Sequence, residues 1–223
     1  MTDYTLYISP EYNPHSLARD WGFFVREKNP KIQAILTPHG NLGALRQVLF
    51  EHAKACVATS RNQKNPATIR LGNKPAKVST DTVSDDPEQL YREVGLDTLS
   101  LALLADVPIH RPLHLTHNNL VGHWRWLRQV WRLCSTVPLL TAEPMASEVQ
   151  FDVIEEVWQG RNNTAIALLR SSFQQLISST GAPQPNDYQT FLANLTVFCP
   201  FIGTELLWRQ GMVTASKDKG MIE

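Results

Sequence analysis

After residue 80, glycine and proline divide the sequence into segments whose apolar residues recur at helical spacing. Helices are predicted over residues 118–135, 147–159 and 163–180, and over a last segment from Asn186 or Asp187 to Gln210. Gly160 and Gly181 end two of these helices, and Pro200 interrupts the last one. Helices of this length with short connections indicate a helical bundle.

Two more helices are predicted just before this series. Asp86 followed by Pro87 is typical of a helix start, with an aspartate cap and a proline in the first turn. Gly95 divides this segment, and Asp97 is expected to cap the second piece, which ends before Pro108.

The first 80 residues show a mixed pattern. Residues 4–9 are aromatic and β-branched and predict a strand, whereas the spacing of apolar residues predicts an amphipathic helix over 43–58. Residues 67–78 predict a hairpin around Gly72 and Asn73, with Pro75 keeping that arm at a sheet edge.

These elements define the expected architecture. The fold class is α+β and predominantly α-helical, with a small N-terminal part that carries short strands and a basic hairpin, and a C-terminal helical bundle. The predicted division is 1–80 for the basic α+β part, 81–215 for the helical bundle and 216–223 for a frayed tail.

Size and cysteine usage place the protein in a broad class. A chain of 223 residues with 43% hydrophobic residues can bury a core without a disulfide or a metal. Its three cysteines, Cys56, Cys134 and Cys199, are odd in number and far apart, which is typical of a reducing compartment. We find no secretory signal and no membrane-spanning apolar run, so we expect a cytoplasmic protein without a membrane partner.

Charge is balanced over the whole chain but uneven along it. Residues 1–80 carry a net charge of +6, residues 81–110 a net charge of −6, and residues 111–140 four basic residues without an acidic one. Such alternating blocks predict a charged partner.

The basic stretch from residue 53 to 80 contains no acidic residue. A phosphate backbone is the commonest polyanion that binds such a surface, so we predict nucleic-acid contacts there. The predicted contact residues are Arg61, Lys64, Arg70, Lys74 and Lys77. The alternatives for this basic stretch are a solvated surface loop and a binding site for an acidic protein partner.

A second cationic surface is predicted on the helix over 118–135. Arg125, Arg128 and Arg132 are spaced i, i+3 and i+7, so they share a stripe that could extend the phosphate track. Trp124 is expected on the opposite side of the helix, which faces the core, and Trp126 at the boundary of the stripe, where it could stack on a base. Alternatively, the tryptophans belong to the core and the arginines pair with the acidic block over 81–106.

Four histidines, His110, His114, His117 and His123, lie within a short stretch and suggest a metal site. Pro112 separates the first two, and no acidic residue occurs between Asp106 and Glu143 to complete a local site. His52 and Cys56, spaced i and i+4, could supply two ligands. No cofactor or metal is therefore predicted, and a His-rich metal- or small-ligand-binding helical protein remains an alternative.

The sequence lacks the short motifs of the common enzyme classes, among them a phosphate-binding loop, a nucleophile elbow, His-Glu-x-x-His and Cys-x-x-Cys. The leading hypothesis is therefore a non-enzymatic nucleic-acid-binding subunit of a multi-protein complex, of the ribonucleoprotein, defence or mobile-element kind. Its expected partners are DNA or RNA and other protein subunits. A scaffold that uses its charge blocks to bind one protein is the second alternative.

Overall fold

The structure is a computed structural model that describes residues 32–60, 76–137, 151–178 and 184–210. Its elements are α2 (Ile32–Leu36), α3 (Leu42–Ser60), β1 (Val78–Thr80), α4 (Pro87–Val94), α5 (Leu96–Leu104), β2 (Leu113–Leu115), α6 (His117–Cys134), α7 (Phe151–Trp158), α8 (Asn162–Ser178), α9 (Pro185–Phe198) and α10 (Pro200–Arg209). The α+β, predominantly helical fold class is confirmed. The predicted strand over 4–9 and the tail over 216–223 lie outside the described residues.

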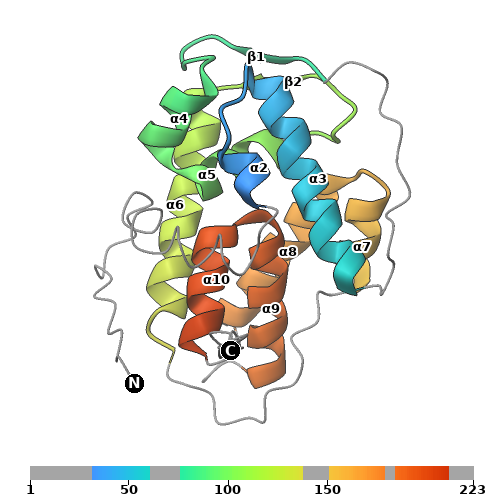
Figure 1. Cartoon of the computed structure of the whole chain (residues 1–223). Helices are drawn as coiled ribbons and strands as arrows, with labels where there is room; N and C mark the ends of the chain where they lie inside the picture. Colours follow the sequence, from blue (N-terminus) through green and yellow to red (C-terminus); the bar gives the residue numbers. More distant parts are fainter. Residues whose placement is uncertain (1–31, 61–75, 138–150, 179–183, 211–223) are drawn as a thin grey trace, which may run out of the picture.

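Helix α5 lies at the centre of the fold. Each of its residues is buried, because six of its nine residues are apolar and spread around the helix, and such a helix needs neighbours on all sides. It packs against α3, α6, α8, α9 and α10. In Figure 1, α3 runs along one side of the molecule and α6 along the other, with α9 and α10 below the short strands.

Helix α3 confirms the helix predicted over 43–58 and joins the same core as the later helices. Leu45, Leu49 and Val57 belong to one hydrophobic cluster that extends to Leu207 in α10. Helix α3 packs against α5, α7 and α9. The described residues therefore share one core on both sides of residue 80, and the division at that residue stays a prediction.

The start of α4 is as predicted. The Asp86 side chain accepts a hydrogen bond from the backbone N–H of Glu88 at 2.9 Å, and Pro87 occupies the first helical position. Gly95, with a φ of 77°, separates α4 from α5. The start of α4 and the boundary between α4 and α5 thus follow from the local sequence.

The prediction for Asp97 was wrong. Asp97 lies inside the first turn of α5, and its carboxylate accepts hydrogen bonds from the backbone N–H groups of Phe201 at 3.2 Å and Ile202 at 2.8 Å. It therefore caps α10, which begins after the predicted break at Pro200. A buried carboxylate far away in the sequence fixes the start of the last helix.

The two described strands form a short parallel pair. Val78 is in register with Leu113 and Thr80 with Leu115, and α4 and α5 make the crossover between the strands. The end of the segment predicted as a basic hairpin, Val78, thus pairs with β2. Residues 67–75 of that segment lie outside the described residues.

Two buried polar side chains hold the loop between α5 and β2. Arg46 of α3 donates to the carbonyl groups of Leu103 and Arg111, both at 2.7 Å, and its other nitrogen donates to two further carbonyls in the loop. Asn162 of α8 accepts from the N–H of Ile109 at 2.8 Å and donates to the carbonyl of Leu104. These bonds satisfy backbone groups that would otherwise be buried without partners.

The helices of the second half follow the predicted order, with α7, α8, α9 and α10 at the predicted places. Tight pairs form between α7 and α8 and between α9 and α10. Among the described helices, none is both long enough and apolar enough to cross a membrane.

Candidate nucleic-acid interface

A capping box fixes where α6 begins and hence which residues it exposes. The Thr116 hydroxyl accepts from the backbone N–H of Asn119 at 3.3 Å, and the Asn119 side chain accepts from the Thr116 N–H at 2.9 Å. From this start, Leu127 and Val130 enter the core without any exposed surface. The cap therefore fixes which residues of α6 face the core and which face outward.

The opposite side of α6 is an exposed polar face. We call it the α6 face, and it consists of Asn118, Gly122, Arg125, Gln129 and Arg132. Their spacing follows one line along the helix, and the face carries no acidic residue. Two of the three arginines in the predicted stripe, Arg125 and Arg132, thus lie on this exposed face.

Arg128 lies beside this face and is only half-buried. Its guanidinium carbon is 4.7 Å from the ring centroid of Trp124, one turn earlier in the helix. This cation–π contact holds the guanidinium close to the helix and also fixes the tryptophan ring.

None of the three α6 arginines forms an ion pair with a described carboxylate. The acidic block over 81–106 finds other partners: Glu88 pairs with Arg92 at 3.4 Å, and Asp81 contacts His114 at 3.0 Å. The alternative in which this block neutralises the arginines is therefore not seen among the described residues.

The interpretation of Trp126 as a base-stacking residue was wrong. Its side chain is 6% exposed and packs edge-on against Phe173, with ring centroids 5.8 Å apart. Arg170 of α8 covers its ring at 5.0 Å. Trp124, which the sequence placed on the core side, is the half-buried tryptophan at the surface.

The basic stretch before residue 80 is described only in part. Arg61, Lys64, Arg70 and Lys74 lie outside the described residues, and Lys77 is exposed just before β1. Lys54, counted among these cations, is 1% exposed, with its amine 3.6 Å from the Glu51 carboxylate. It is therefore no part of a nucleic-acid surface.

Lys77 lies on a different element from the α6 arginines. It lines an open hollow together with Asp85 and Asp86, whose carboxylates would oppose a phosphate. In Figure 1, β1 lies at the top of the view and the end of α6 near the bottom. The structure thus groups Arg125, Arg128 and Arg132 and leaves Lys77 apart.

The histidines lie in different environments. His110 and His117 are exposed, and His114 bonds to the Ser79 hydroxyl at 3.1 Å. His123 is buried and accepts from the Arg170 guanidinium at 2.8 Å. Burial, aided by the Arg170 charge, lowers the pKa of His123 to about 4, so the ring is neutral. Within the described residues, no group of three metal-ligating side chains converges.

Next to Trp124, a half-open groove of about 510 Å³ separates α6 from α4 and the loop before it. The α6 side contributes His117, Val121 and Trp124, and the other side contributes Ser84, Gln89 and Glu93. One wall is thus aromatic and close to the arginines, and the other is polar.

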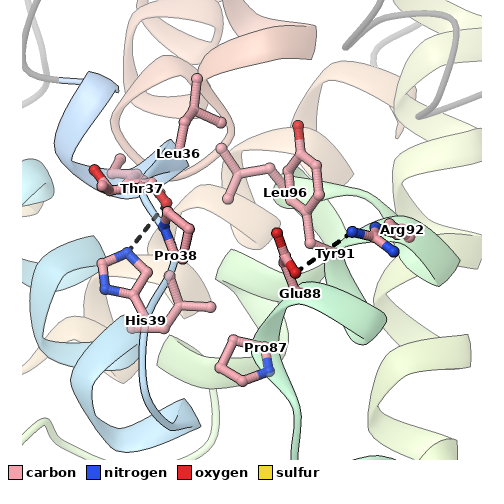
Figure 2. Close-up of a pocket in the computed structure, with 11 residues that line it drawn as sticks. Leu36, Thr37, Pro38, His39, Pro87, Glu88, Tyr91, Arg92 and Leu96 are labelled. Carbon is pink, nitrogen blue, oxygen red and sulfur yellow. Dashed lines mark hydrogen bonds and ion pairs between the residues drawn. The ribbon is translucent and has the colours of Figure 1, made fainter.

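The far side of α4 faces a smaller hollow of about 190 Å³, shown in Figure 2. Its polar groups are already engaged, since Glu88 pairs with Arg92 and the His39 ring donates to the Ile35 carbonyl at 3.2 Å. Leu36 and Leu96 close it with apolar surface. This hollow is the weaker candidate for a ligand.

No protein-family model matches the chain. Short segments are similar to leucine–tRNA ligases: 29% identity over 76 residues for the Rhodospirillum rubrum enzyme, 32% over 74 residues for that of Paramagnetospirillum magneticum, and 35% over 48 residues for that of Anaplasma marginale. These segments cover 34%, 33% and 22% of this chain but only 9%, 8% and 6% of the ligases. The matches thus span less than a tenth of the length of these enzymes, and they relate about a third of the chain to proteins that act on tRNA.

Proposed function

We propose that this chain is a non-enzymatic RNA-binding subunit that binds the phosphate backbone of tRNA or a tRNA-like RNA along the α6 face. Arg125 and Arg132 would contact phosphates directly, and Arg128 would add positive charge beside them. Gln129 would donate a hydrogen bond to the same backbone.

The observation that carries this proposal is the composition of the α6 face. Arg125 and Arg132 are exposed on one helical line, and neither has a described carboxylate partner. Cations in such a position contribute most to the binding free energy of an external polyanion, because no internal ion pair has to be broken first.

The segmental similarity to leucine–tRNA ligases supports RNA rather than DNA as the polyanion. The names of those enzymes state that they act on tRNA. The matched segments of this chain would make a similar contact with RNA.

Binding rather than catalysis is proposed because the most perturbed titratable groups lie in the core. Burial raises the pKa values of Asp97 and Glu205 to about 7, and their side chains are 2% and 0% exposed. A catalytic group with a shifted pKa would instead be expected in an open hollow.

The test is a salt titration of binding to a fluorescein-labelled tRNA transcript, followed by anisotropy. The double variant Arg125→Gln, Arg132→Gln is expected to bind roughly tenfold to a hundredfold more weakly near 0.1 M salt. The slope of log affinity against log salt should fall in magnitude by about 2, because each phosphate contact contributes about one unit.

The matched control is Arg92→Gln, Arg161→Gln, which removes two exposed arginines that already pair with Glu88 and Glu156. It has the same change in net charge, and it should leave the slope unchanged. Equal slopes for the wild type and both double variants would reject the α6 face as the binding surface.

Gly122 provides an independent variant on the same face. A Cβ atom added there would meet nothing within 4 Å, so packing does not require the glycine. Gly122→Ala should therefore stabilise the fold by about 0.5–1 kcal/mol in urea unfolding. If RNA lies close to the helix backbone, the same variant weakens tRNA binding; stronger or unchanged binding would argue against that approach.

A further inference from the structure

We propose that the groove between α4 and α6 holds one unpaired guanine base of the RNA bound on the α6 face. This inference rests on the proposed function and adds a base-specific site to it. A volume of about 510 Å³ lies within the range of small-molecule sites, about 300–1,000 Å³.

Trp124 provides the surface on which a base would stack. Its ring lines the groove, and Arg128 lies over one of its faces at 4.7 Å. The Arg128 contact holds the ring in place, and the part of the ring that lines the groove would be available to a base. Stacking on an aromatic side chain contributes to binding of any base, so Trp124 alone gives affinity without choice of base.

The polar wall of the groove would provide selectivity for one kind of base. The Ser84 hydroxyl donates to the Gln89 side-chain oxygen at 2.8 Å, and the Gln89 amide donates to the Glu93 carboxylate at 2.7 Å. This chain of hydrogen bonds runs in one direction and ends on a group that only accepts. Glu93 is exposed and forms no ion pair with a described cation.

Guanine is the base that matches such an acceptor. Its Watson–Crick edge presents two adjacent N–H donors, the ring N1–H and the exocyclic amino group, which can bind both oxygens of one carboxylate. Adenine and cytosine present an amino group next to a ring acceptor, and uracil presents one N–H between two carbonyls. Each of these would bring an acceptor toward the Glu93 carboxylate, which costs binding energy.

The charge distribution sets the direction in which the nucleotide would lie. Asp85, Asp86 and Glu88 are exposed on and before α4, whereas Arg125 and Arg128 lie on the α6 side. A phosphate is repelled from the first group and attracted by the second. The base would therefore point toward α4 and the ribose-phosphate toward α6.

The experiment measures the affinity of short oligouridine RNAs that carry one central guanosine, inosine or adenosine. For the wild type, we expect guanosine to bind roughly tenfold more tightly than adenosine, with inosine between them because it lacks the exocyclic amino group. Trp124→Ala should weaken the guanosine RNA at least about tenfold, and Trp124→Phe should restore most of the loss.

Glu93→Gln separates base choice from overall affinity. It should remove the preference for guanosine, because guanosine loses the paired acceptor and adenosine is no longer repelled by the carboxylate, whereas Glu88→Gln on the other side of α4 should keep the preference. Equal binding of the three RNAs by the wild type, or a preference that survives in Glu93→Gln, would overturn the guanine site. If the Arg125 and Arg132 variants still weaken these RNAs, the proposed function stands without it; if no RNA binds the wild type, both fail.

Discussion

Replacing Arg46 by methionine is expected to lower the free energy of unfolding by about 4 kcal/mol or more, an effect large enough to unfold many domains. The Arg46 side chain is fully buried, and its guanidinium donates to four backbone carbonyls between Leu103 and Arg111. These carbonyls end α5 and form the loop that leads to β2. Arg46 therefore ties α3 to the centre of the fold.

The size of the effect follows from the nature of the partners. A buried ion pair can often be replaced by apolar residues, because both charged groups are removed together. Backbone carbonyls cannot be removed by substitution, so the methionine variant leaves them buried without donors. Burial lowers the pKa of Arg46 to about 10, which still leaves the guanidinium charged at neutral pH, next to the negative end of the α5 dipole.

Urea unfolding followed by circular dichroism measures this loss. Arg46→Lys should recover only part of it, because an ammonium group lacks the planar fork that reaches several carbonyls. Arg92→Met, at an exposed arginine on α4, should change the stability by less than about 0.5 kcal/mol. Similar stabilities for Arg46→Met and Arg92→Met would contradict the role given to Arg46.

Asp97→Ala is expected to lower the free energy of unfolding by about 3 kcal/mol at neutral pH, because it leaves two buried N–H groups of α10 without an acceptor. These groups belong to Phe201 and Ile202, and no other described side chain bonds to them. Asp152→Ala is the matched control, since Asp152 also lies in the first turn of a helix but is exposed. The control should cost less than about 1 kcal/mol. Equal losses in the two variants would argue against the capping role.

The same residue predicts a pH dependence with a definite sign. Burial raises the pKa of Asp97 to about 7, against the two backbone hydrogen bonds that favour its charged form. Between about pH 4 and 7, the folded state therefore keeps a proton that the unfolded state has released, and stability from this group is lost as the pH rises.

Asp97→Asn isolates this effect, because asparagine does not titrate and the other buried groups are the same in both proteins. The wild type should lose up to about 4 kcal/mol relative to Asp97→Asn as the pH rises from 4 to 7. Chemical denaturation at several pH values measures the difference. A constant difference across this range, or one of opposite sign, would show that Asp97 does not hold the proton.

Elements with local signals could be predicted from the sequence. The cap at Asp86, the break at Gly95 and the break at Pro200 depend on side chains and backbone angles within a few residues, and all three predictions are confirmed. The same holds for the apolar spacing that gives α3 and α6.

Features with distant partners could not be predicted. The local sequence predicts that Asp97 caps its own helix, yet its carboxylate oxygens accept hydrogen bonds from the first turn of α10. Nothing in the sequence around Arg46 indicates that its side chain is buried in the core. The pairing of Val78 with Leu113 likewise joins segments separated by two helices. Each depends on how helices pack, which is set by the whole chain.

The candidate site was predicted in part for the same reason. The spacing of Arg125, Arg128 and Arg132 was enough to place them together, because one helix determines it. Which of Trp124 and Trp126 faces outward depends on the side of α6 that packs against the rest of the core, and the sequence prediction reversed them.

Photo-crosslinking tests the central claim, that RNA lies along the α6 face, most directly. A tRNA transcript containing 4-thiouridine would be irradiated with the full-length protein, and the crosslinked peptides would be identified by mass spectrometry. We expect crosslinks to peptides from His117–Cys134, and we expect them to be lost when Arg125 and Arg132 are both changed to glutamine. Crosslinks confined to other helices, or unchanged in that variant, would contradict it.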